Sequence, residues 1–171
     1  MALLACVAGL ALLAAACGAG GQSSYADPFA YCSAVGTVDT PDARYTGAKL
    51  PDDVAQGLQV AMGLPTGMPP PPIADNSYWR CMDGKVYACT VGANLPCMEK
   101  ASTDSNPTNE MKDYCKANPA SNFIPMAVTG HATVYEWRCS NGTPEVASQM
   151  VTPDARGFLS NIWYEIQQGG Q

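Results

Sequence analysis

Cysteine is the residue type with the most specific chemistry in this chain. Cys81, Cys89 and Cys97 stand eight residues apart within the stretch NSYWRCMDGKVYACTVGANLPC. Such thiols could bind a metal ion, carry out a redox reaction or form disulfide bonds. Zinc sites usually pair their ligands two to four residues apart, and the sequence contains neither CxxC nor CxxxxC. We therefore expect disulfides, with no metal site and no cofactor.

His131 is the only histidine in the chain, and histidine is the one side chain that titrates near neutral pH unaided. It is therefore the obvious candidate for a general base. The sequence lacks the motifs GxSxG, HExxH and SxxK, and it has no glycine-rich phosphate loop. We predict no catalytic residue and favour a non-enzymatic protein, with a small secreted hydrolase that uses His131 as the alternative.

The N-terminal segment predicts export. Residues 1–16, MALLACVAGLALLAAA, carry no charge, and they are too few for a transmembrane helix, which needs roughly 20 apolar residues. They fit a signal peptide. Residues 17–26 contain GAGGQSS and are expected to form a flexible tether. Residues 27–171 are expected to form a single disulfide-stapled domain, interrupted by a proline-rich spacer at 65–72.

The stretch LLAAACGAGG resembles a bacterial lipoprotein signal, in which small residues lead into a cysteine and a Gly/Ser-rich tether follows. The resemblance implies that Cys17 is acylated and becomes the first residue of the mature chain. Plain cleavage at an Ala-x-Ala site is the alternative. Either route predicts an extracytoplasmic protein, which is membrane-anchored by lipid or else secreted or periplasmic.

The cysteines that remain after loss of the signal peptide are even in number, which in an oxidising compartment indicates three disulfides. They are Cys32, Cys81, Cys89, Cys97, Cys115 and Cys139.

Sequence patterns predict an α+β fold. Helices are expected at about 28–35, 51–62 and 107–117, where suitable start and stop residues flank stretches with one apolar face. Antiparallel hairpins are expected at about 78–89 and 133–146, where Asx-Gly pairs separate β-prone runs. The hairpins should build a small antiparallel sheet.

Several element ends can be assigned from residue type. Asp27 is the expected N-cap of the first helix and Gly36 its stop, and Asn106 is the expected N-cap of the third helix. The stretch 157–166 fits helical and strand spacing about equally. We favour a strand there, because aromatic and β-branched residues dominate.

The Asp83-Gly84 pair fixes the register of the first hairpin. A two-residue type I′ turn pairs Cys81 with Val86 and Trp79 with Ala88, so these four residues share one face, which should be buried. Cys89 lies on the opposite face, and it should therefore not bond to Cys81. The candidate binding face consists of Tyr78, Arg80 and Tyr87, together with His131.

Sequence alone does not fix the disulfide pairing, since six cysteines allow 15 pairings. We favour Cys97–Cys115, because Cys115 lies on the buried face of the third helix and Cys97 precedes that helix. Two arrangements of the other four cysteines then stay open: Cys32–Cys81 with Cys89–Cys139, or Cys32–Cys89 with Cys81–Cys139.

Two short sequences recur. WRCMDG at 79–84 is echoed by WRCSNG at 137–142, and TPDAR occurs at 40–44 and at 152–156. The echoes fit either an internal duplication or a coincidence of common hairpin chemistry.

The formal charge of −6, with only nine Lys and Arg residues, excludes a nucleic-acid groove. The acidic charge favours solubility, and the only property of a partner that it indicates is a basic surface. We expect an envelope or extracellular protein or glycan as the partner, and membrane contact only through a lipid anchor.

The segment NPASNFIPMAVTGHATVYEWRCSNG, with the lipoprotein-type signal and the hairpins, resembles an uncharacterised family of bacterial envelope lipoproteins, which implies no activity. Cys81 and Gly84 are also similar in placement to the Tyr-x-Cys-x-x-Gly strand of lipoprotein inhibitors of c-type lysozyme. That resemblance implies an inhibitor of a basic envelope-targeting enzyme. The Ser-Gly-x-x-Tyr loop of those inhibitors is absent here, and no site residue is carried over.

Overall fold

The computed structural model describes residues 23–65, 76–92 and 96–169. The expected signal peptide, Cys17 and most of the proline-rich spacer lie outside these residues. The described chain is α+β, as the sequence predicts, with short helices and two small antiparallel sheets. The elements in chain order are α1 (Pro28–Val35), α2 (Asp52–Ala61), β1 (Ser77–Met82), β2 (Lys85–Thr90), α4 (Asn109–Ala117), α5 (Met126–Thr129), β3 (Tyr135–Ser140), β4 (Thr143–Gln149), the 3₁₀ helix η1 (Ser160–Ile162) and β5 (Tyr164–Ile166).

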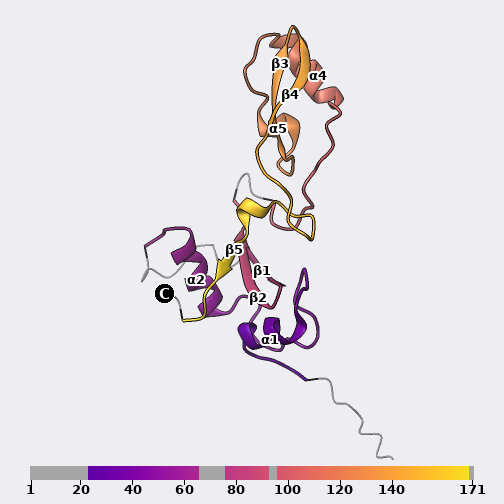
Figure 1. Ribbon diagram of the computed structural model, residues 1–171. Coiled ribbons are helices and arrows are strands. Elements are labelled where there is room, and N and C mark those ends of the chain that lie inside the picture. Colours follow the sequence, from indigo (N-terminus) through magenta and orange to yellow (C-terminus); the bar gives the residue numbers. More distant parts are fainter. Residues whose placement is uncertain (1–22, 66–75, 93–95, 170–171) are drawn as a thin grey trace, which may run out of the picture.

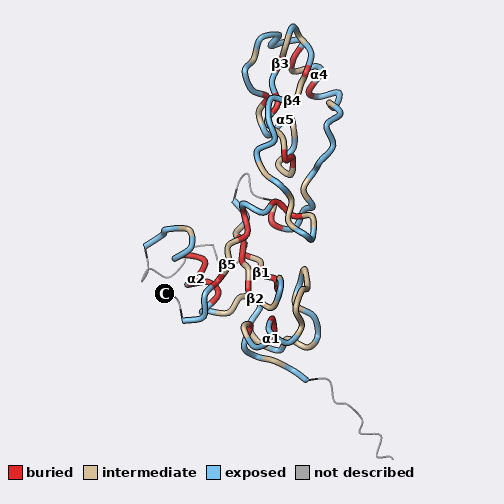
Figure 2. Tube along the Cα trace, viewed as in Figure 1, coloured by how far each residue is buried: buried red, intermediate tan, exposed pale blue. Residues whose placement is uncertain are grey.

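The elements gather into two parts. One part holds the sheet β1-β2-β5 with α1 and α2 beside it, and the other holds the hairpin β3–β4 with α4 and α5 (Figure 1). Buried residues occur in both parts and in the segment between them (Figure 2). That segment contributes Phe158, Leu159, Ile162 and Trp163 to a middle hydrophobic cluster, which also contains Cys89.

The capping residues of α1 are those that the sequence predicts, whereas the N-cap of α4 is a different residue from the predicted one. The Asp27 carboxylate accepts a hydrogen bond from the Phe29 N–H at 2.7 Å, and Gly36 ends α1 at a φ of 77°. The prediction that Asn106 is the N-cap of the third helix is wrong. Its N–H and side-chain amide both bond to Asp104 in a local turn, so the helix begins later, with Thr108 accepting from the N–H of Met111.

The first hairpin has the predicted register. Cys81 pairs with Val86 and Trp79 pairs with Ala88 around the Asp83-Gly84 turn. All four paired residues are buried, as expected.

The expected strand at 157–166 is present only in its last three residues. Leu159 and Ile162 are buried in the middle cluster, and the chain makes a 3₁₀ turn there before β5 pairs with β2.

The structure contains three disulfides: Cys32–Cys81, Cys89–Cys97 and Cys115–Cys139. The favoured pair Cys97–Cys115 is wrong. Cys97 instead bonds to Cys89, only eight residues away in the sequence, and α4 packs on the second hairpin, where Cys139 lies. Neither open arrangement of the other four cysteines is formed as a whole, because Cys32–Cys81 is present but the Cys89–Cys139 bond expected with it is not. Cys81 and Cys89 are not bonded to each other, as predicted.

The same unit occurs twice, because each hairpin carries a disulfide to a helix that precedes it. The first unit is α1 with β1–β2, and the second unit is α4 with β3–β4. Both helices contain Tyr-Cys-x-Ala, at 31–34 and 114–117, and both hairpins contain Trp-Arg-Cys followed by x-Asx-Gly, at 79–84 and 137–142. In each unit the helix cysteine bonds to the strand cysteine.

Backbone hydrogen bonds have the same register in both units. Four residues after the helix cysteine, the carbonyl oxygens of Gly36 and Pro119 accept from the turn glycine of the hairpin, at 2.9 and 3.0 Å. Six residues after it, the carbonyl oxygens of Val38 and Ser121 accept from the strand cysteine, at 3.0 and 2.8 Å. The echo of WRCMDG and WRCSNG is therefore part of a repeated three-dimensional arrangement.

The TPDAR echo is different. Asp42 and Asp154 each accept a hydrogen bond from the N–H two residues later, at 3.0 and 2.8 Å. The first turn lies between the helix and hairpin of the first unit, and the second follows the hairpin of the second unit. The shared sequence thus encodes the same local turn at two unrelated places.

Candidate functional site

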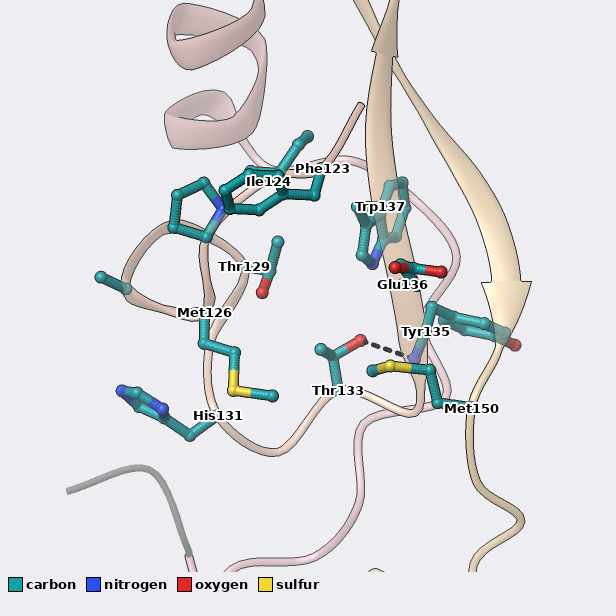
Figure 3. A pocket seen from close by; sticks show the side chains of 12 residues that line it. Phe123, Ile124, Met126, Thr129, His131, Thr133, Tyr135, Glu136, Trp137 and Met150 are labelled. Carbon is teal, nitrogen blue, oxygen red and sulfur yellow. Dashed lines mark hydrogen bonds between the residues drawn. The ribbon is translucent and has the colours of Figure 1, made fainter. Parts of the chain in front are cut away.

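A pocket of about 450 Å³ lies in the second unit, beside Trp137. Its walls come from β3, from α5 with the residues before it, and from the loop between α5 and β3 (Figure 3). The residues that line it are Phe123, Ile124, Pro125, Met126, Ala127, Thr129, His131, Thr133, Tyr135, Glu136, Trp137 and Met150.

Backbone bonds hold the two walls together. The N–H of Ile124 donates to the carbonyl oxygen of Trp137 at 2.7 Å, which fixes the segment before α5 against β3. Pro125 then starts α5, a helix of only four residues. The Thr133 hydroxyl accepts from the N–H of Tyr135 at 3.2 Å at the entry to β3 (Figure 3). These contacts leave an opening that the short α5 does not cover.

The pocket has a buried floor and an exposed apolar rim. Ile124 and Trp137 are buried, whereas Phe123, Met126 and Met150 are 59%, 41% and 51% exposed. Large apolar side chains that remain exposed next to a hollow are typical of binding sites. Methionine is common in such rims, because its unbranched side chain adapts to different occupants.

The indole N–H of Trp137 is buried in this apolar pocket and has no hydrogen-bond partner among the described residues. An unpaired buried donor is costly. The equivalent indole in the first unit is satisfied, because Trp79 donates to the carbonyl oxygen of Lys49 at 2.8 Å. The Glu136 carboxylate stands at the pocket and accepts from the Ser148 hydroxyl at 3.1 Å.

His131 belongs to the same pocket, at its far edge from Trp137 and beyond Met126 (Figure 3). Its Nδ1 atom is buried and has no hydrogen-bond partner within the described parts of the chain. A hydrolase would need a carboxylate to orient this ring or a hydroxyl for it to deprotonate. The geometry brings neither into hydrogen-bond contact with His131.

The expected exposed face of Tyr78, Arg80 and Tyr87 is not formed. Arg80 is 0% exposed, and its guanidinium lies over the rings of Phe158 and Trp163, at 4.6 and 4.2 Å from their centroids.

Tyr78 and Tyr87 are half-buried against the middle cluster. Burial, together with a hydrogen bond to Glu165, raises the pKa of the Tyr87 hydroxyl. The alternation of the strands is as predicted, but the segment 158–163 covers the face that was expected to be free.

Sequence reasoning missed most of the pocket, including Phe123, Met126 and Met150. Trp137 lies in the core, but its role as a wall of the pocket was not foreseen. The repeated Tyr-Cys-x-Ala sequence was the available signal. Together with the repeated Trp-Arg-Cys, it shows that the second unit has a much shorter connection between helix and hairpin.

A scan against protein-family models finds no family that matches this chain, and searches of curated proteins and of solved structures find no match either. Within the described ranges, no three His, Cys, Asp or Glu residues are grouped so as to hold a metal ion. In that part of the chain, no helix combines the length and hydrophobicity needed to cross a membrane. The three disulfides indicate an oxidising, extracytoplasmic compartment.

Proposed function

We propose that this protein is an exported bacterial envelope protein that acts as a non-enzymatic binding module, and that the Trp137 pocket is its ligand site. The observation that carries the proposal is a hollow of about 450 Å³ with apolar walls and a buried indole N–H that lacks a partner in the described part of the chain. Ligand pockets commonly combine this size, apolar lining and a few polar groups. The ligand would bring an apolar group and a hydrogen-bond acceptor for the Trp137 N–H.

Filling the pocket tests this role. Ala127 lines the pocket, and Ala127→Leu should occupy part of the space. We expect the neutral dye N-phenyl-1-naphthylamine to bind the wild-type protein saturably, with a rise in fluorescence. Its affinity should fall by about tenfold or more in Ala127→Leu, a loss of at least about 1.4 kcal/mol.

Ala147→Leu is the matched control, because Ala147 is an exposed β4 residue outside the pocket lining. Equal dye binding by both variants, or none by the wild type, would refute the pocket as a ligand site.

The anchoring proposal concerns Cys17. A lipid on this residue would hold the binding module at a membrane surface through the tether 17–26. Intact-mass measurement of the membrane fraction should show a chain that begins at Cys17 and carries acyl groups. A soluble, unmodified chain that begins after Cys17 would contradict the anchor and leave export standing.

Two other functions have weaker support. A hydrolase that uses His131 lacks an observed partner for the imidazole. Inhibition of a basic enzyme such as lysozyme would agree with the net charge of −6, and such an enzyme would then be one kind of protein partner for the pocket.

A further inference from the structure

The pocket beside Trp137 has a smaller counterpart beside Trp79, of about 180 Å³. In each pocket, two lining residues stand eight and nine positions after the helix cysteine. Three further lining residues are consecutive in the first strand of the hairpin, and the last of them is the tryptophan. They are Thr40, Pro41 and Ser77 to Trp79 in the first unit, and Phe123, Ile124 and Tyr135 to Trp137 in the second. The two hollows therefore occupy the same position in the repeated unit.

The first unit fills part of its own hollow with a segment of its own chain. The disulfide partners are 49 residues apart in the first unit and 24 in the second. The longer connection brings Lys49 to the pocket, where its carbonyl oxygen accepts from the Trp79 indole N–H at 2.8 Å. The same connection places the ring of Tyr45 edge-on to Trp79, with centroids 4.7 Å apart. A peptide segment thus satisfies this indole and covers it.

The second unit has the same hollow without that peptide. Its volume is larger, and the indole N–H of Trp137 has no acceptor within the described chain. We propose that the Trp137 pocket binds an extended peptide segment of a partner protein, with a main-chain carbonyl on the Trp137 N–H. This inference rests on the proposed binding function. Met126 and Met150 at the rim have unbranched side chains that can adapt to such a segment.

Charge indicates which peptide fits. Glu136 occupies the position that Tyr78 has in the first unit, and it carries the only formal charge among the residues lining the Trp137 pocket. Its carboxylate is exposed and is bonded to the uncharged Ser148 hydroxyl. A Lys or Arg in the bound segment would pair with Glu136. The whole chain, at −6, also attracts a basic partner.

The test uses the chain's own segment as the probe. A capped peptide with the sequence of residues 45–50, YTGAKL, is titrated into the oxidised, ¹⁵N-labelled full chain. The three indole N–H signals report Trp79, Trp137 and Trp163 separately. We expect the Trp137 signal to shift saturably and the Trp79 signal to stay in place, since Trp79 already has its acceptor.

Variants separate the two contacts. Trp137→Phe keeps a ring and removes the N–H, so it should weaken binding by about three- to tenfold, the usual value of one hydrogen bond. Glu136→Gln should weaken binding and flatten its salt dependence. The matched control is Glu145→Gln on the same hairpin, which pairs with Arg138 outside the pocket and should leave the affinity unchanged.

The outcomes distinguish the two proposals. If the neutral dye binds in the pocket and the peptide leaves the Trp137 signal unmoved, the ligand is not a peptide. The further inference is then overturned while the binding function stands. If neither binds, both fall. A peptide that shifts Trp79 as much as Trp137, or that binds Glu136→Gln and wild type equally, also overturns the peptide inference.

Discussion

Arg80 lies on the strand face opposite Cys81 and is nevertheless wholly buried. Its guanidinium is paired with the carboxylate of Asp154 and lies over the rings of Phe158 and Trp163. Burial raises the pKa of the Asp154 carboxyl, but hydrogen bonds from Arg80 and from the N–H groups of Phe158 and Arg156 outweigh it, and the pKa is lowered. The equivalent Arg138 of the second unit is exposed and pairs with Glu145.

Asp154→Asn should destabilise the protein by about 3 kcal/mol at pH 7, because it leaves the buried Arg80 charge unpaired. A carboxyl whose folded pKa is lowered stabilises the fold above the unfolded pKa, near 3.9 for Asp, and this contribution is lost as the pH falls through the folded value. The difference between wild type and variant should therefore be constant from pH 7 to about pH 5 and narrow below about pH 4. Denaturant unfolding across this range measures it.

Asp113→Asn is the control, since Asp113 belongs to an exposed pair with Lys116 and should cost less than about 1 kcal/mol. A gap between wild type and Asp154→Asn that is equally wide at pH 2.5 and pH 7 would contradict the proposed ion pair.

The sequence predicted correctly which face of β1 carries Arg80, but it predicted wrongly that this face is exposed. The Asp83-Gly84 turn fixed which side of β1 Arg80 lies on, because a two-residue turn determines strand register. Its burial depends on Asp154, 74 residues further along the chain. Nothing local in YWRCMDG carries that information.

At the level of elements, the three disulfides differ in how much chain they close. Loop closure predicts that removing Cys89–Cys97, with a separation of 8 residues, costs about 2.5 kcal/mol, against about 4 kcal/mol for Cys32–Cys81, with a separation of 49. The Cys115–Cys139 pair, at 24, should lie between them.

Paired Cys→Ala variants compared by denaturant unfolding measure this order. All six sulfurs are buried, so the cavity left by each pair should be similar. A larger cost for the Cys89–Cys97 pair than for the Cys32–Cys81 pair would show that packing, rather than chain entropy, dominates.

Most of the helices and hairpins could be predicted from the sequence, but the contacts and disulfides between them could not. Asp27 and Gly36 gave the ends of α1, and the Asx-Gly pairs gave both hairpins, because caps and turns depend on neighbouring residues. The predicted partner of Cys97 was wrong, because Cys97 bonds back to Cys89. The sequence between β2 and α4 has no turn signature strong enough to predict this bond. The pocket was missed for a related reason. It arises because the connection between α4 and β3 lacks the segment that, in the first unit, covers the tryptophan.

At the level of the whole molecule, one helix–disulfide–hairpin unit occurs twice and is completed differently each time. The first unit adds β5 to its hairpin and narrows its tryptophan hollow to about 180 Å³ with Tyr45 and Lys49. Among the described residues, the second unit has two strands in its sheet and a larger hollow at Trp137. In the account proposed here, the first unit with the middle cluster serves as scaffold, and the second unit presents the binding site.

Site-specific cross-linking from the pocket rim tests this account most directly. Phe123, a rim residue that is 59% exposed, is replaced by p-benzoylphenylalanine in the full exported chain, and light is applied to intact cells. Val91, which is exposed in the first part of the molecule and lies outside the pocket, receives the same group as the control.

If the Trp137 pocket is the binding site, position 123 should form a discrete cross-link to one partner protein, at a segment that contains Lys or Arg. This cross-link should be absent from position 91 and should disappear when Ala127→Leu fills the pocket. Equal cross-linking from both positions, or a product that persists in the Ala127→Leu chain, would contradict the claim that the Trp137 pocket is the binding site.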